Sequence, residues 1–330
     1  MKKRDSLVNN AIVTRGLTKV FRDSTAVDEL NLDVREGELF GLLGPNGAGK
    51  TTTVRMLCTL IEPTRGTATI AGHDLIREPS KVRRQIGVVS EGVMLYKELT
   101  IEENLQFLSK LYDLPRKEAE NRIAELLEMF KFEEKAKRMV GALSSGWTKK
   151  ALICAALLHN PKILFLDEVT SGLDPQSAQA LQDFTKDLCK RGVTVVWTTH
   201  YMMEPERICD RIGIVYAGRL IQVGSPDELK QKASELSVLE VDTPGMSGQQ
   251  LERIRNYGDV CSVSYNDPIL KIACVRNDDL AEHVTKLLIS EGAKIRSIST
   301  KGPTLEEAFI KLTGGEEEID RFLEKSRAQK

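Results

Sequence analysis

Residues 44–51, GPNGAGKT, fit the pattern G-x-x-x-x-G-K-[ST] at every fixed position. An apolar stretch precedes this segment and a helical pattern follows it, which is the strand–loop–helix context that the pattern requires. In such a loop, backbone N–H groups surround the β-phosphate of a nucleotide, Lys50 reaches the β- and γ-phosphate oxygens, and the Thr51 hydroxyl binds Mg²⁺. The segment therefore predicts a site for a nucleotide and Mg²⁺, built from Gly44, Pro45, Asn46, Gly47, Ala48, Gly49, Lys50 and Thr51.

Two carboxylates end the apolar stretch KILFL, and a histidine ends a second apolar stretch at 193–200. Asp167 at a strand tip can hold the Mg²⁺ shell, and Glu168 beside it can polarise a water for in-line attack on a γ-phosphate. The alternative is that both acids only cap a helix. Open α/β sheets bind ligands at the carboxyl ends of their strands, so we expect His200 to face the nucleotide as well.

The segment LSSGW (143–147) predicts a second anion site. Ser144 can cap a helix, Gly146 leaves the backbone uncovered, and a helical pattern runs on to Asn160. The free N–H groups and the dipole of a helix start both favour a bound anion.

Five apolar stretches separated by helical patterns predict an α/β fold with a mostly parallel sheet covered on both faces. These stretches are 38–43, 83–89, 162–168, 193–200 and 211–218. The region of about 98–160 differs, because it contains charged amphipathic helices and a capping box from Thr100 to Glu103. We interpret it as a helical insert.

After about residue 235 the pattern becomes strand, helix, two strands, helix and strand. This βαββαβ order is that of a ferredoxin-like α+β fold. A last helix begins at Thr304, where Glu307 completes a capping box. We therefore expect a first domain over 1–232, a C-terminal accessory domain over 233–315 and a charged tail over 316–330.

The composition is that of an ordinary soluble globular protein, with 330 residues, 41% hydrophobic, 29% charged and a formal net charge of −1. This charge argues against a nucleic-acid binder that works by bulk charge. The basic start MKKRDSLVNN has no apolar core behind it, and no apolar run approaches the roughly 18 residues that span a bilayer. We expect any membrane connection to come through a partner.

The order of these segments resembles that of the ATP-binding subunits of ABC transporters, which are P-loop NTPases, over nearly all of residues 11–225. The resemblance rests on the glycine-rich loop, a glutamine-loop-like segment at 86–96, LSSGW, the KILFLDE strand, SGLD at 171–174, and His200. The ending PTLEEAFIKLTGG (303–315) and the small C-terminal domain look like the drug-resistance branch of that family. Members of this branch energise export through a separate membrane subunit.

The resemblance implies that the chain binds ATP with Mg²⁺ and hydrolyses it to drive export of a drug, antibiotic, lipid or ion. In this family two ATPase domains dock head to tail, so that Ser144 and Gly146 of one domain hold the ATP bound to the other. The remaining implied roles are adenine stacking by Phe21, phosphate and Mg²⁺ binding by Lys50, Thr51 and Thr52, proton abstraction by Glu168, contact with the γ-phosphate by His200, and a place at the dimer seam for Asp174.

The resemblance also implies the partners and the location of the chain. The partners are a multi-span membrane permease and a second copy of this chain or a homologous ATPase, without nucleic acid. The location is cytoplasmic, peripheral on the inner face of the cell membrane.

Three departures from the family pattern stand out, of which the first two bear on the rate of hydrolysis and the third only on a turn. Ser145 and Trp147 replace a glycine and the glutamine of LSGGQ, and Trp147 packs either over a ribose across the seam or within its own chain. Glu91 stands at the glutamine of the glutamine loop, where it keeps an oxygen for Mg²⁺ but adds a negative charge near the γ-phosphate. Val169 replaces a proline that often follows the catalytic glutamate. The alternatives are therefore a degenerate or regulatory ABC subunit, or a soluble ABC clamp, with weak ATPase activity.

Overall fold

The computed structural model describes residues 9–22, 24–90, 92, 94–233, 236–256, 260–275, 280–290, 292–301 and 304–313. The chain divides into two compact units, residues 1–223 and residues 224–330. The sequence placed this boundary at 232/233. The difference arises because helix α8 (Pro226–Ala233) packs with α11 (Leu305–Thr313) inside the second unit. The charged tail at 316–330 lies outside the described residues.

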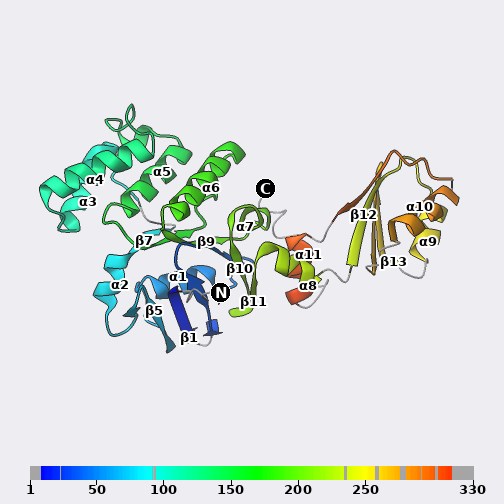
Figure 1. Ribbon diagram of the computed structural model, residues 1–330, viewed down its shortest axis with the longest axis horizontal. Coiled ribbons are helices and arrows are strands. Elements are labelled where there is room, and N and C mark those ends of the chain that lie inside the picture. The colour runs from blue at the N-terminus through cyan, green and yellow to red at the C-terminus, as the bar shows by residue number, and fades with distance from the viewer. Residues whose placement is uncertain are drawn as a thin grey trace, which may run out of the picture. The chain divides into compact units, whose positions relative to one another are not determined.

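A six-stranded sheet in the order β11-β10-β4-β9-β8-β7 forms the centre of the first unit (Figure 1). Its strands are β4 (Leu39–Leu43), β7 (Ile86–Val89), β8 (Ile163–Asp167), β9 (Thr194–Thr199), β10 (Arg211–Tyr216) and β11 (Arg219–Gly224). The five strands from β10 to β7 run parallel, which confirms the expected α/β sheet. Every side chain of β4 and β8 is buried, as in a sheet covered on both faces.

Helices cover this sheet on both sides. Helix α1 (Lys50–Leu57) lies on one side and α6 (Pro175–Lys190) on the other, and α7 (Met203–Ile208) follows β9 (Figure 1). Residues 83–85 are helical rather than extended, because α2 (Pro79–Gln85) begins with a proline whose fixed φ suits the first helical turn.

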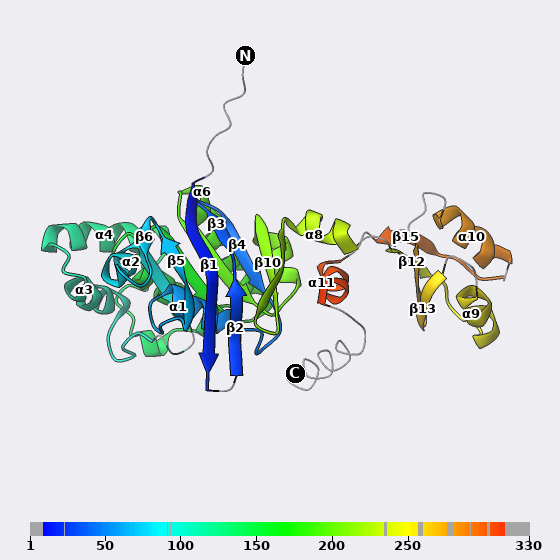
Figure 2. The ribbon, with the colours of Figure 1, turned by 90° about the horizontal axis from the view of Figure 1, so that it is seen from below.

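A second, antiparallel sheet precedes and follows α1 in the chain, and the sequence patterns did not separate it from the first. It contains β1 (Asn10–Phe21), β2 (Ser24–Leu30), β3 (Asp33–Arg35), β5 (Arg65–Ile70) and β6 (His73–Asp74). The strand order is β2-β1-β5-β6, with β3 also beside β1 (Figure 2). One buried cluster joins Ile12 of this sheet to Met56 of α1 and Phe165 of β8, so α1 is packed against both sheets.

The expected helical insert contains α3 (Ile101–Leu111), α4 (Arg116–Met129), a 3₁₀ turn (Val140–Ala142) and α5 (Ser145–Ala156). Its capping box is confirmed: the Thr100 hydroxyl accepts the Glu103 N–H at 3.1 Å, and Glu103 accepts the Thr100 N–H at 2.8 Å. Across the described parts of the chain, no helix has the length and apolar character needed to span a membrane.

The second unit contains a four-stranded antiparallel sheet in the order β13-β14-β12-β15. The strands are β12 (Leu236–Asp242), β13 (Val260–Asn266), β14 (Ile269–Val275) and β15 (Ser297–Lys301), and the helices between them are α9 (Gly248–Arg255) and α10 (Leu280–Ser290). This βαββαβ order with the first and third strands at the centre is the expected ferredoxin-like arrangement. Its core contains Leu239, Val241, Ile254, Leu270, Ile272 and Leu288.

Candidate active site

The loop of residues 44–49 connects β4 to α1 and touches backbone from other segments. A Cβ at Gly44 would lie 2.2 Å from the carbonyl oxygen of Val215, and one at Gly49 would lie 2.4 Å from that of Ala26. Gly49 also adopts a φ of 102° at the N-cap of α1. Only glycine fits at both positions, so this loop can take the tight form that brings backbone N–H groups close to a ligand.

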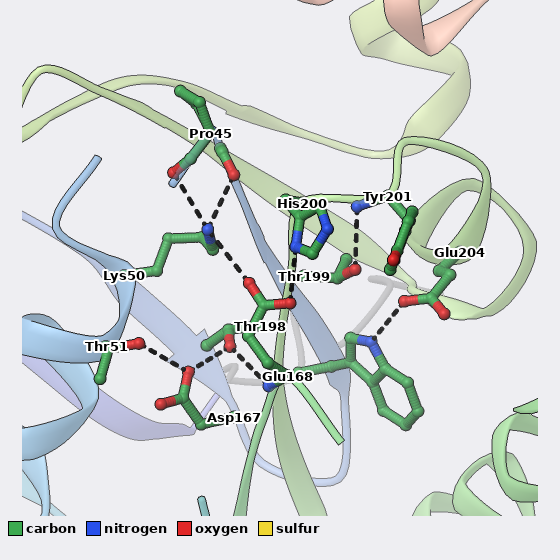
Figure 3. Close-up of polar contacts among 12 residues, drawn as sticks. Pro45, Lys50, Thr51, Asp167, Glu168, Thr198, Thr199, His200, Tyr201 and Glu204 are labelled. Carbon is green, nitrogen blue, oxygen red and sulfur yellow. Dashed lines mark hydrogen bonds and ion pairs between the residues drawn. The ribbon is translucent and has the colours of Figure 1, made fainter. Parts of the chain in front are cut away.

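Lys50, the first residue of α1, is only 5% exposed. Its ammonium donates to the carbonyl oxygens of Gly44 at 2.8 Å and Pro45 at 3.1 Å, and lies 3.2 Å from Glu168 Oε1 (Figure 3). A buried cation is costly unless it is paired and hydrogen-bonded. All three partners are groups that phosphate oxygens can replace as acceptors.

Asp167, the last residue of β8, is 4% exposed and lies beside two hydroxyls. Its Oδ1 accepts hydrogen bonds from Thr51 Oγ1 at 3.3 Å and from Thr198 Oγ1 (Figure 3). A carboxylate and a hydroxyl oxygen at this distance are the hard ligands that Mg²⁺ prefers, so Thr51 and Asp167 fit a magnesium site.

Glu168 follows directly and connects Lys50 to His200. Its Oε1 faces Lys50, and its Oε2 lies 2.8 Å from His200 Nδ1 (Figure 3). An ionised carboxylate only accepts hydrogen bonds, so Nδ1 of His200 carries the hydrogen. Glu168 adopts a φ of 53°, a region that non-glycine residues seldom occupy, and its backbone N–H is held by the hydroxyl and carbonyl oxygens of Thr198 at 3.1 and 3.2 Å.

The protonation of Glu168 follows from these neighbours. Burial raises the pKa of this carboxyl, but the hydrogen bond from His200 and the charge of Lys50 lower it by more, so its pKa lies below the ordinary value of 4.5. Glu168 is therefore ionised at neutral pH, which is the form that can accept a proton from water.

The structure describes three further predicted site residues, Phe21, Asp174 and Thr52. Phe21 ends β1 with 48% of its surface exposed, and the Lys19 ammonium lies 5.1 Å from the centre of its ring. Asp174 is exposed at the N-cap of α6, where hydrogen bonds from Ser177 lower its pKa. Thr52 is half-buried in the first turn of α1, and Glu91 lies outside the described residues.

The LSSGW segment begins α5, as expected. Ser144 is exposed and is the N-cap residue of α5, as predicted, although its side chain makes no capping hydrogen bond. Its backbone carbonyl accepts from the Thr148 hydroxyl at 3.0 Å and the Thr148 N–H at 2.9 Å. Gly146 faces α6, since a Cβ there would lie 2.8 Å from Ser177 Oγ.

Trp147 packs within its own chain. Its ring lies 5.3 Å from that of the fully buried Phe132, and the ammonium groups of Lys135 and Lys150 lie 4.3 and 4.7 Å from its centre. These contacts favour packing within the chain over a ribose for Trp147.

Sequence patterns did not identify one residue that contributes to this site. Thr198 lies opposite Asp167 in the β8–β9 register and contacts both Asp167 and the backbone of Glu168. Its only signal is a polar residue inside an otherwise apolar strand, VVWTTH, which marks a buried hydroxyl but does not identify its partner.

Comparisons with known proteins bear on this site. The ABC transporter family matches residues 27–171. The chain is 37% identical over 305 residues to the linearmycin resistance ATP-binding protein LnrL of Bacillus subtilis, which covers 90% of this chain and 96% of that one. It is 34% identical over 314 residues to the daunorubicin resistance ATP-binding protein DrrA3 of Streptomyces coeruleorubidus, with 95% and 99% covered.

Solved structures match the first part of the chain. An ATP-binding subunit of an ABC transporter superposes with a TM-score of 0.60 at 32% identity, covering 67% of this chain and 92% of that one. The cbiO1 subunit of the cbiONQ ABC transporter from Clostridium perfringens superposes with a TM-score of 0.63 at 26% identity, covering 68% and 92%.

Proposed function

This chain belongs to the ABC transporter family, and from that premise we propose that it hydrolyses ATP to drive export of an antibiotic-like compound through a separate membrane subunit. The observation that carries the proposal is the contact of Glu168 with both Lys50 and His200 beside the phosphate loop. Similarity along almost the whole chain to linearmycin- and daunorubicin-resistance proteins supports the export role.

The residues divide the chemistry between them. When the β- and γ-phosphates enter the loop, Lys50 exchanges carbonyl and carboxylate acceptors for phosphate oxygens, because these carry more negative charge. Glu168 is then free to accept a proton from the attacking water, while His200 offers the hydrogen on Nδ1 to the γ-phosphate. Thr51 and Asp167 would hold Mg²⁺, which supplies positive charge against the phosphates.

Each chain carries one phosphate loop and one LSSGW segment. We propose that two chains, or this chain and a homologous ATPase, dock head to tail, so that Ser144 and Gly146 of one hold the ATP bound to Lys50 of the other. Phe21 stacks on the adenine, which its exposed ring permits, and the exposed Asp174 lies at the seam.

The membrane permease needs a docking surface, and the helical insert offers one. We define the apolar face as Met94, Tyr96, Phe107, Leu111 and Tyr112, which are 38–74% exposed. Tyr96 and Phe107 pack edge to face at 5.2 Å. Apolar side chains gathered on a surface mark a protein interaction site.

A groove of about 580 Å³ adjoins the apolar face, because Tyr112 stacks at 4.2 Å on His159, which lines the groove with Arg122. His159 Nε2 lies 2.9 Å from the Ile86 carbonyl and so carries the hydrogen, which leaves Nδ1 as an acceptor. That Nδ1 and Arg122 Nε are buried without a partner among the described residues. Docking of a permease loop on the apolar face and this groove would place the chain at the inner face of the membrane.

Hydrolysis by the purified chain, compared with Glu168→Gln, tests the enzymatic part. We expect Mg²⁺-dependent phosphate release by the wild type, a loss of about 10³-fold in the variant, and a stable ATP-bound dimer of the variant in light scattering. A variant that stays monomeric at saturating Mg-ATP would contradict pairing of two copies.

The departures at Trp147 and Glu91 favour a second candidate, a weakly hydrolysing regulatory subunit. A wild type that binds ATP tightly yet releases phosphate no faster than Glu168→Gln would select this candidate.

Phe107→Asp tests the permease surface. This variant should bind and hydrolyse ATP as the wild type does, but should no longer co-purify with a multi-span membrane permease that the wild type captures. Lys190→Ala, at an exposed position of α6 outside the apolar face, is the control. Co-purification of Phe107→Asp at the wild-type level would show that the apolar face is not the docking surface.

A further inference from the structure

The indole of Trp197 in β9 is fully buried two residues before Thr199, the end of the strand. A buried indole N–H needs an acceptor, because an unmade hydrogen bond in the interior is costly. Its acceptor is Oε2 of Glu204, at 3.5 Å, on helix α7. Oε1 of the same carboxylate accepts from the amide of Gln182, on α6, at 3.4 Å. Glu204 therefore contacts side chains of two other elements, β9 and α6.

Two further contacts attach α7 to α6. Arg207 pairs with Asp183 at 2.9 Å, and the Lys186 ammonium donates to the Arg207 carbonyl at 2.7 Å. The Arg207–Asp183 pair is 40% and 55% exposed and is therefore weak. Gln182 is 6% exposed and Trp197 is fully buried, so among these polar contacts those of Glu204 are the ones that reach buried side chains.

Only three residues separate the end of β9 from α7, and His200 is the first of them. The next residue, Tyr201, donates its N–H to Thr199 Oγ1 at 3.0 Å, and its ring lies 4.1 Å from that of His200. Figure 3 shows His200 on the Glu168 side of this segment and Glu204 at its far end. A shift of α7 therefore reaches His200 through a short segment with little freedom to absorb it.

We propose that Glu204 is a positioning residue for His200: by holding α7 to Trp197 and Gln182, it sets where the His200 imidazole stands beside Glu168. The proposal rests on the proposed function, in which His200 serves the γ-phosphate. Glu204 itself touches neither Glu168 nor the phosphate loop through any contact of the described residues.

The test compares Glu204→Ala with Glu204→Gln in the full chain. Glutamine keeps an amide oxygen for the indole N–H, and its NH2 can donate to the Gln182 oxygen once the Gln182 amide turns over, whereas alanine removes both contacts. We expect kcat for ATP to fall about tenfold in Glu204→Ala, as for a small misplacement of a catalytic group. The Kd for ATP should stay within about twofold, because the phosphate loop is unaltered, and Glu204→Gln should keep more than half of kcat. Lys190→Ala, an exposed pair with Asp187 on the same helix α6, is the matched control and should leave kcat unchanged.

Should Glu204→Ala fail to fold, Gln182→Met keeps a side chain of similar length, removes the amide that donates to Glu204 Oε1, and should lower kcat in the same direction, by about threefold. A folded Glu204→Ala with wild-type kcat overturns the proposal. So does a Glu204→Gln as slow as the alanine variant, or a loss of kcat matched by the loss of ATP affinity. If the wild type itself neither binds nor hydrolyses ATP, the proposed function fails instead, so the two failures are distinguishable.

Discussion

Trp147→Gln, which restores the glutamine common in the family, should destabilise the first unit. The ring packs at 5.3 Å on Phe132 and lies under the ammonium groups of Lys135 and Lys150. An aromatic pair contributes about 0.5–1.5 kcal/mol beyond burial, and each partly exposed cation–π contact about 0.5 kcal/mol. With the lost burial of a half-buried ring, about 1 kcal/mol, the expected loss is about 2.5–3.5 kcal/mol in the free energy of unfolding.

Urea unfolding followed by tryptophan fluorescence measures this loss. The chain has two tryptophans, so in Trp147→Gln the only emission comes from Trp197, which is fully buried in β9 and reports the first unit. The midpoint should fall while the denaturant slope stays constant. Trp147→Phe is the control, because it keeps an aromatic face toward Phe132 and both lysines.

A difference between wild type and Trp147→Gln of less than about 0.5 kcal/mol, the size of an ordinary surface substitution, would refute this reasoning. It would mean that Trp147 does not make these contacts in solution. The ribose across a dimer seam would then be the better assignment for its ring.

Lys50→Ala should weaken ATP binding at least tenfold, about 1.4 kcal/mol, in a calorimetric titration; unchanged affinity would contradict the phosphate-loop assignment. Because the pKa of Glu168 is lower in the folded chain than its ordinary value of 4.5, its ionised form adds stability above that value and loses it as pH falls through the folded-state pKa. Below about pH 4.5 the free energy of unfolding of the wild type should therefore fall relative to that of Glu168→Gln. Parallel pH profiles of the two proteins in urea unfolding would contradict this prediction. Gly146→Asp should abolish ATP-driven dimerisation in light scattering, because a carboxylate at the start of α5 repels the phosphate of the partner's ATP, while monomer ATP affinity stays intact; dimers of this variant would show that LSSGW lies outside the seam. A chain ending at residue 232 should still bind ATP, because both phosphate-contacting segments lie in the first unit; a folded truncation without binding would show that the second unit completes the site.

Apolar periodicity predicted the parallel strands well, since β4 and β8 are buried along their whole length and read as continuous runs. It did not separate the antiparallel sheet, because β1 and β2 alternate buried and exposed residues irregularly and their register shifts near residue 19. Nothing local in such a pattern identifies the partner strand.

The site residues likewise divide into those that sequence patterns predicted and those that they did not. Lys50, Asp167, Glu168 and His200 were predicted to meet because each ends or follows a strand at one sheet edge, and they do. Thr198 was not, because its role depends on the β8–β9 register, which a sequence pattern does not contain. Sequence patterns could not predict the packing of Trp147 either, because it depends on where residues 130–135 lie relative to α5.

Helix α1 has a consequence for how the first unit holds together. Because Met56 is packed in one continuous cluster with Ile12 of the antiparallel sheet and Phe165 of the parallel sheet, the two sheets are not separable modules. The strand that ends in Phe21 and the strand that ends in Asp167 belong to one cooperative folding unit. Phe21 and the phosphate loop therefore stand on one shared core, and we expect a substitution that loosens this core to disturb both ends of the proposed nucleotide site.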